Sequence, residues 1–133
     1  MVKMMTTDAP KKKRRKKAYL ICPVRGHDRR ETEQVVKDLE AQGWDVYWPH
    51  RDTNQYDNIT GGFRICKDNR KAIREADNIF MVWDGKSKGS LFDAGMAFIL
   101  EKPLTVIEAP PESLGKAFQN VFYTWDEEGC ANG

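Results

Sequence analysis

Residues 79–95 read IFMVWDGKSKGSLFDAG and contain a strand signal, a turn and a helix start in succession. The apolar run 79–83 predicts a buried strand because it is short, continuous and bounded by turn residues. After a turn of glycine, serine and lysine, apolar side chains at helical spacing predict a helix over about 90–101. Free backbone N–H groups and the helix dipole make such a unit suitable for binding an anion. The alternative is a structural turn, in which Asp93 only complements the helix dipole.

The remainder of the chain repeats this alternation of strands and helices. Further strands are expected at 18–23, 44–49, 103–107 and 121–125. Further helices are expected from Asp28 or Thr32 to about 42, over 62–76 and over 113–119, with a long loop at 53–62. Short, mostly apolar strands that alternate with helices favour a parallel sheet covered on both faces. We therefore predict a doubly wound, Rossmann- or flavodoxin-like α/β domain with about five strands.

The net charge of +2 hides an uneven distribution along the 133 residues. Residues 1–17 hold eight lysines and arginines against one aspartate, so the rest of the chain is net acidic. We expect a disordered basic tail at 1–17 and one folded domain at 18–133. The basic run 11–17 is open to three interpretations: contact with nucleic acid, a nuclear targeting signal or a solubilising extension.

Several classes of protein are disfavoured by the sequence. Its three widely spaced cysteines form neither a disulfide framework nor a zinc pattern, which favours a reducing, cytoplasmic setting. No apolar run is long enough for a membrane span, and no signal peptide is expected. The chain has neither a Walker A motif nor a GxGxxG motif, which disfavours an NTPase or a dinucleotide enzyme, and we expect no metal and no cofactor.

Ligands of doubly wound folds bind beyond the carboxyl ends of the strands. This rule selects Arg25 and Gly26 after the first strand, the loop 49–62, and the turn 84–90 with its serines and glycines. Asp68 falls near the apolar stripe of its helix, where a carboxylate is costly unless it is paired or faces a polar site. It either faces the site or reaches a cation such as Arg64 or Lys71. In the first case, Asp68, Asp84 and Asp93 bring three carboxylates to one pocket, which suits chemistry at an anomeric carbon.

The order and spacing of several short motifs resemble the nucleoside 2-deoxyribosyltransferase family over about residues 18–127. The motifs are YLICP at 19–23, Asp68, Asp84, S-x-G-S-x-x-D-x-G at 87–95, Ala97 and the pair Lys102-Pro103. Within that family, the chain is more similar to the nucleoside 5′-monophosphate N-glycosidases. Ser87 stands where the transferases commonly carry an aspartate, Arg25-Gly26 matches a phosphate-binding turn, and TWDEEG at 124–129 resembles the C-terminal end of these hydrolases.

The resemblance implies hydrolysis of the N-glycosidic bond of a (deoxy)nucleoside 5′-monophosphate, without a cofactor, by a homodimer or larger assembly. It implies that Asp93 is the nucleophile, that Asp68 orients or protonates the reacting groups and that Tyr19 positions the nucleophile. It places Asp84 in the sugar pocket and assigns substrate binding to Arg25, Gly26, Ser87, Gly89 and Ser90. It also implies that Ser113 contacts the phosphate from a neighbouring subunit. The family's nucleophile is usually glutamate, one methylene longer than Asp93. Base exchange between free nucleosides is one alternative function. A nucleotide-binding sensor is another, because Asp93 stands in place of the usual glutamate.

Overall fold

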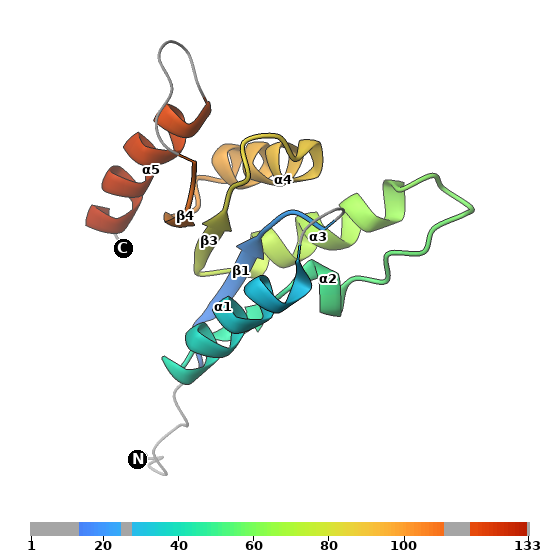
Figure 1. The fold of residues 1–133 in the computed structure, drawn as a ribbon, viewed down its shortest axis with the longest axis horizontal. Coiled ribbons are helices and arrows are strands. Elements are labelled where there is room, and N and C mark those ends of the chain that lie inside the picture. Colours follow the sequence, from blue (N-terminus) through green and yellow to red (C-terminus); the bar gives the residue numbers. More distant parts are fainter. Residues whose placement is uncertain (1–13, 25–27, 111–117, 133) are drawn as a thin grey trace, which may run out of the picture.

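The computed structural model describes residues 14–24, 28–110 and 118–132. The described chain forms a three-layer α/β/α domain around a parallel sheet, which confirms the predicted fold class (Figure 1). The sheet has four strands in the order β2-β1-β3-β4, one fewer than predicted. The strands are β1 (Lys17–Ile21), β2 (Asp45–Tyr47), β3 (Asn78–Val82) and β4 (Leu104–Glu108).

Five helices alternate with these strands. They are α1 (Arg29–Ala41), α2 (Pro49–Asp52), α3 (Phe63–Glu75), α4 (Lys88–Ile99) and α5 (Phe118–Asn132). The short helix α2 was not predicted, and it begins where Pro49 ends the expected second strand. The long segment between α2 and α3 is a loop, as predicted, and reaches out from the body of the domain (Figure 1).

The two faces of the sheet carry separate cores. Alternate residues of β1 and β3, including Leu20 and Phe80, pack with Val36 and Leu39 of α1 on one face. The intervening residues, including Tyr19, pack on the other face with side chains from α3, α4 and α5. Successive strand residues point to opposite faces, so the apolar runs of β1 and β3 fill both cores at once.

Local signals set the helix starts and stops close to their predicted positions. The Asp28 side chain accepts a hydrogen bond from the Arg30 backbone N–H at 2.9 Å, so Asp28 rather than Thr32 caps α1. Gly43 follows α1 with a φ of +99°, which only glycine adopts without strain. At the start of α4, the Ser87 side chain accepts from the Ser90 backbone N–H at 3.2 Å. The helix therefore begins two residues earlier than predicted.

The predicted strand over 121–125 is wrong, because these residues lie inside α5. Gln119, Phe122 and Trp125 are buried at a spacing of three, which is a helical and not an alternating pattern. Trp125 donates from Nε1 to the Lys102 carbonyl at 2.8 Å, and Asp126 accepts from the Val106 backbone N–H at 3.1 Å. These bonds fix α5 against the edge strand β4. The helix expected at 113–119 lies largely outside the described residues.

The end of the basic run belongs to the folded domain. Lys17 is the first residue of β1, and the boundary expected between 17 and 18 thus falls inside this strand. Arg14 pairs with Asp77 at 3.1 Å, and Arg15 donates to the carbonyls of residues 40, 43 and 44 where α1 ends. A cation there satisfies carbonyls that have no partner within the helix. Among the described helices, none has the length and apolar character needed to cross a membrane.

Candidate active site

Tyr19 and Asp93 meet between β1 and α4. The Tyr19 hydroxyl donates a 2.7 Å hydrogen bond to Asp93 Oδ2, and the Tyr19 side chain is fully buried. The sheet order places β1 beside β3, and the chain leaves them in opposite directions, toward β2 and β4. This is the switch point at which doubly wound folds bind ligands. The structure thus brings together two of the three residues expected to be catalytic.

On α3, Asn69 is the second side chain, after Tyr19, whose hydrogen bonding lowers the pKa of Asp93. It also accepts a 2.7 Å bond from the Thr53 hydroxyl, and Thr53 shares a 2.6 Å bond with the Tyr47 hydroxyl. The Tyr47 ring stacks on Tyr19, with ring centroids 5.6 Å apart and planes 9° apart. Five side chains from five different segments therefore form a closed network with Asp93 as its acidic member.

Burial controls the acidity of the groups in this network. It raises the pKa of the Asp93 carboxyl to about 6, against the hydrogen bonds from Tyr19 and Asn69, which favour the ionised form. Burial, with the Asp93 charge nearby, raises the pKa of Tyr19 well above its usual value. The same two causes raise the pKa of Cys66, and burial raises that of Cys22 to about 12. At neutral pH, Asp93 is an anion among neutral groups, the state that a nucleophile needs.

Asp68 is directed elsewhere. Its carboxylate forms a 2.7 Å ion pair with Arg64 and is about half exposed, which matches the second of the two predicted alternatives. Arg64 also donates to the carbonyls of Asn54 and Tyr56, so the pair fastens the loop before α3. Asn69, and not Asp68, contacts Asp93. Sequence reasoning missed Asn69 although its spacing was a signal, since it lies four residues after Ile65 and four before Ile73 on the inward stripe.

The turn after β3 is built by Asp84 and Ser87. Asp84 Oδ1 accepts hydrogen bonds from the backbone N–H groups of Lys86 and Ser87 at 2.9 and 2.8 Å. These bonds fix the conformation of the turn and use one oxygen of the carboxylate. Gly85 supports the turn with a φ of +84°. The Ser90 hydroxyl is buried in the first turn of α4 without a hydrogen-bond partner within the described structure. A buried hydroxyl of this kind is a group that a polar ligand can satisfy.

The other predicted binding residues contribute less. Gly89 is exposed in the first turn of α4, and a side chain there would meet nothing within 4 Å. Arg25, Gly26 and Ser113 lie outside the described residues. Across the described ranges, no group of three or more His, Cys, Asp or Glu residues is arranged to hold a metal ion.

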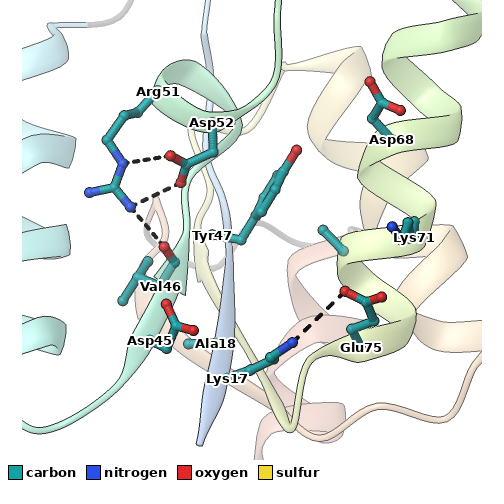
Figure 2. Close-up of a pocket in the computed structure, with 11 residues that line it drawn as sticks. Lys17, Ala18, Asp45, Val46, Tyr47, Arg51, Asp52, Asp68, Lys71 and Glu75 are labelled. Carbon is teal, nitrogen blue, oxygen red and sulfur yellow. Dashed lines mark hydrogen bonds and ion pairs between the residues drawn. The ribbon is translucent and has the colours of Figure 1, made fainter. Parts of the chain in front are cut away.

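A polar groove of about 580 Å³ runs between β2 and α3 (Figure 2). Tyr47 and Asp52 on one wall face Asp68 on the other, and Lys17 pairs with Glu75 at 4.0 Å across its lower end. Arg51 pairs with Asp52 at 2.8 Å and donates to the Val46 carbonyl at 2.8 Å. Through Tyr47, this groove adjoins the hydrogen-bonded network around Asp93.

Comparison with known proteins finds likeness only at the level of three-dimensional structure. No protein-family model and no curated protein matches the chain. A 2-deoxyribosyltransferase from Bacillus psychrosaccharolyticus superposes with a TM-score of 0.61 and 19% identity, over 82% of this chain and 95% of that chain. The CMP N-glycosidase BcmB of Clostridium botulinum superposes with a TM-score of 0.53 and 22% identity, over 68% of this chain and 70% of that chain.

The chain has the fold of these two enzymes. At such identities the likeness establishes the fold and does not by itself assign an activity. The fold nevertheless matches the one that the resemblance implied, and the network of Tyr19, Asn69 and Asp93 lies where such folds bind ligands. The chemistry of that network is the basis for a functional assignment.

Proposed function

We propose that this chain cleaves the N-glycosidic bond of a (deoxy)nucleoside 5′-monophosphate, with Asp93 as the nucleophile. The observation that carries the proposal is the buried carboxylate of Asp93, held by the Tyr19 hydroxyl at 2.7 Å and by Asn69. Fixed donors orient the carboxylate and leave it anionic above pH about 6. Two enzymes with the same fold, a 2-deoxyribosyltransferase and a CMP N-glycosidase, support this class of chemistry.

The proposed reaction has two steps. The Asp93 carboxylate forms a bond to C1′ of the sugar while the C1′–N bond breaks, and the base leaves with the electron pair and takes a proton from water. Water then attacks C1′ of the glycosyl ester, loses a proton to solvent and releases the sugar 5-phosphate together with the Asp93 carboxylate. Tyr19 and Asn69 hold the carboxylate in one orientation throughout, which reduces the entropy cost of attack.

Phosphate recognition is assigned to the turn at the start of α4, together with Arg25 and Gly26. Ser87 caps α4 with its side chain, and the buried Ser90 hydroxyl has no hydrogen-bond partner in the described structure. A helix N-terminus with hydroxyl groups suits a phosphate better than a carboxylate at the same place would, because two anions repel each other. Arg25 and Gly26 are proposed to complete this site, and Ser113 is proposed to contact the phosphate from a neighbouring subunit.

The second candidate is base exchange, in which a free base instead of water takes up the sugar. It is favoured by the superposition on the 2-deoxyribosyltransferase, which extends over 95% of that chain. Both reactions use the same glycosyl ester, so they differ in the acceptor alone.

We also propose that the chain forms a homodimer. Helix α4 exposes Phe92 and Ile99, which lie seven residues apart on one face of the helix, as an apolar surface that a second copy related by a two-fold axis would cover. Analytical ultracentrifugation tests this proposal, and a monomer at micromolar concentration contradicts it.

The function is tested by incubating the protein with a panel of ribo- and deoxynucleoside 5′-monophosphates and measuring free base by chromatography. Release of base from at least one of them is expected, with Asp93→Asn inactive and Asp45→Asn, at the first position of β2, fully active. Exchange between a nucleoside and a free base, without net hydrolysis, favours the transferase. Full activity of Asp93→Asn contradicts both mechanisms.

A further inference from the structure

A buried chain of hydrogen bonds leads from Asp93 to two residues that lie away from α4. Asn69 and Thr53 are 7% and 4% exposed, and the Thr53 hydroxyl donates to Asn69 Oδ1 at 2.7 Å. Tyr47 and Thr53 join their hydroxyl oxygens at 2.6 Å. Thr53 directly follows α2, at the start of the long loop before α3. The loop is thus tied to the candidate nucleophile through one amide side chain.

The direction of each bond follows from the chemistry of the groups. An ionised Asp93 only accepts, so the NH₂ group of Asn69 faces Asp93 and its oxygen faces Thr53. The single hydroxyl proton of Thr53 goes to Asn69, so Tyr47 is the donor in the remaining bond. Without the Thr53 hydroxyl, the Asn69 oxygen loses the hydrogen bond that holds the amide in place on the side away from Asp93.

The titratable and polar groups that act on Asp93 come from β1 and α3. Tyr19 and Cys22 approach from β1 and its carboxyl end, and Asn69 and Cys66 approach from α3. The tyrosine and both thiols have a raised pKa and remain neutral near pH 6. The charge of Asp93 in this range therefore depends on burial and on its two hydrogen-bond donors.

We propose that Thr53 is a positioning residue, whose hydroxyl locks the Asn69 amide with its NH₂ group toward Asp93 and so fixes the carboxylate for attack. Thr53 acts through Asn69 and does not touch the substrate. The effect on turnover rests on the function proposed above, whereas the effect on the Asp93 carboxylate does not.

The test compares Thr53→Val, which removes the hydroxyl but keeps the shape, with Thr53→Ser, which keeps the hydroxyl. Thr60→Val is the matched control, because Thr60 lies in the same loop and its hydroxyl bonds Asp57 instead. The carboxyl of Asp93 is titrated by ¹³C NMR without substrate, and its resonance is assigned by its loss in Asp93→Asn. A hydrogen bond to a carboxylate favours its ionised form, so loosening one should raise the pKa of Asp93 by about one unit in Thr53→Val. Thr53→Ser and Thr60→Val should titrate like the wild type.

Turnover gives the second readout. Thr53→Val should lower kcat about tenfold with KM within about twofold of the wild type, and Thr53→Ser should restore kcat. Thr53→Ala, which adds no atoms, replaces Thr53→Val if the latter fails to fold. An unchanged Asp93 titration in the folded variant overturns the proposal, whether or not the wild type releases base. A wild type that releases no base, with the titration shifted as expected, contradicts the proposed function and leaves the positioning role established.

Discussion

The Tyr19 hydroxyl and Asp93 Oδ2 lie 2.7 Å apart, joining the middle of the central strand β1 to the first half of α4. A buried tyrosine cannot move without disturbing the sheet core, so this bond holds the carboxylate to a rigid element. We expect Tyr19→Phe to keep the ring packing and to raise the pKa of Asp93 above about 6, because the carboxylate loses a donor. The acidic limb of the kcat/KM profile should move to higher pH, and an unmoved limb contradicts the assignment.

The stability of the protein should depend on pH through Asp93. Its pKa is about 6 when folded and 3.8 in the ordinary reference state, so the folded chain binds more protons between these values. Stability from this group is full below about pH 4 and is lost as pH rises through about 6. Urea unfolding should therefore show Asp93→Asn gaining about 1–2 kcal/mol more over the wild type at pH 8 than at pH 5. An equal difference at both pH values contradicts the raised pKa.

Asn69→Asp should create a pair of carboxylates. Two carboxylates in contact cannot both ionise freely, so the pair should titrate with one apparent pKa well above the wild-type value of about 6.

Asp68→Asn provides the contrast at the neighbouring position, where the side chain pairs with Arg64. It should leave the acidic limb of the profile in place and lower stability by at most about 1 kcal/mol. A loss of turnover in Asp68→Asn comparable to that of Asp93→Asn supports the catalytic role that the family resemblance implies for Asp68.

Helix α5 can be tested by two substitutions that separate a helix from a strand. Phe122 and Trp125 are 3% and 9% exposed, and Trp125 stacks edge-to-face on Phe98. Phe122→Ala and Trp125→Ala should each cost about 3–5 kcal/mol by urea unfolding, because a helix puts residues three apart on one face. An alternating strand puts residues 122 and 125 on opposite faces, so a loss below about 1 kcal/mol at one of the two positions contradicts the helix.

Sequence signals located the regular core of the fold well. Apolar runs bounded by turn residues identify β1, β3 and β4 to within about two residues, and the signal is strongest for β1 and β3, which are buried on both faces. The segment 121–125 misled the prediction because valine, phenylalanine, tyrosine, threonine and tryptophan all have high strand propensity, and only packing reveals the spacing of three. Propensity was overridden by tertiary contacts.

The candidate site was predictable in part. Asp93 and Tyr19 were singled out correctly as neighbours because each belongs to a short motif of the family resemblance. Asn69 was missed because the prediction considered carboxylates and not amides as catalytic groups. Asn69 nevertheless lies on the inward face of α3 and is more buried than Asp68. The network through Thr53 and Tyr47 joins residues from three segments, and sequence spacing carries no information on such contacts.

On each edge strand of the sheet, a side chain forms a hydrogen bond with a backbone group that points away from the neighbouring strand. Arg51 donates to the Val46 carbonyl on β2, and Asp126 accepts from the Val106 backbone N–H on β4. An exposed edge strand can pair with a strand of another chain and so extend the hydrogen-bond ladder of the sheet, which leads to open-ended aggregation. Here each such pairing would first have to displace a charged side chain. The homodimer proposed above would instead use helical surfaces, where two-fold contacts close on themselves and stop at a defined number of copies.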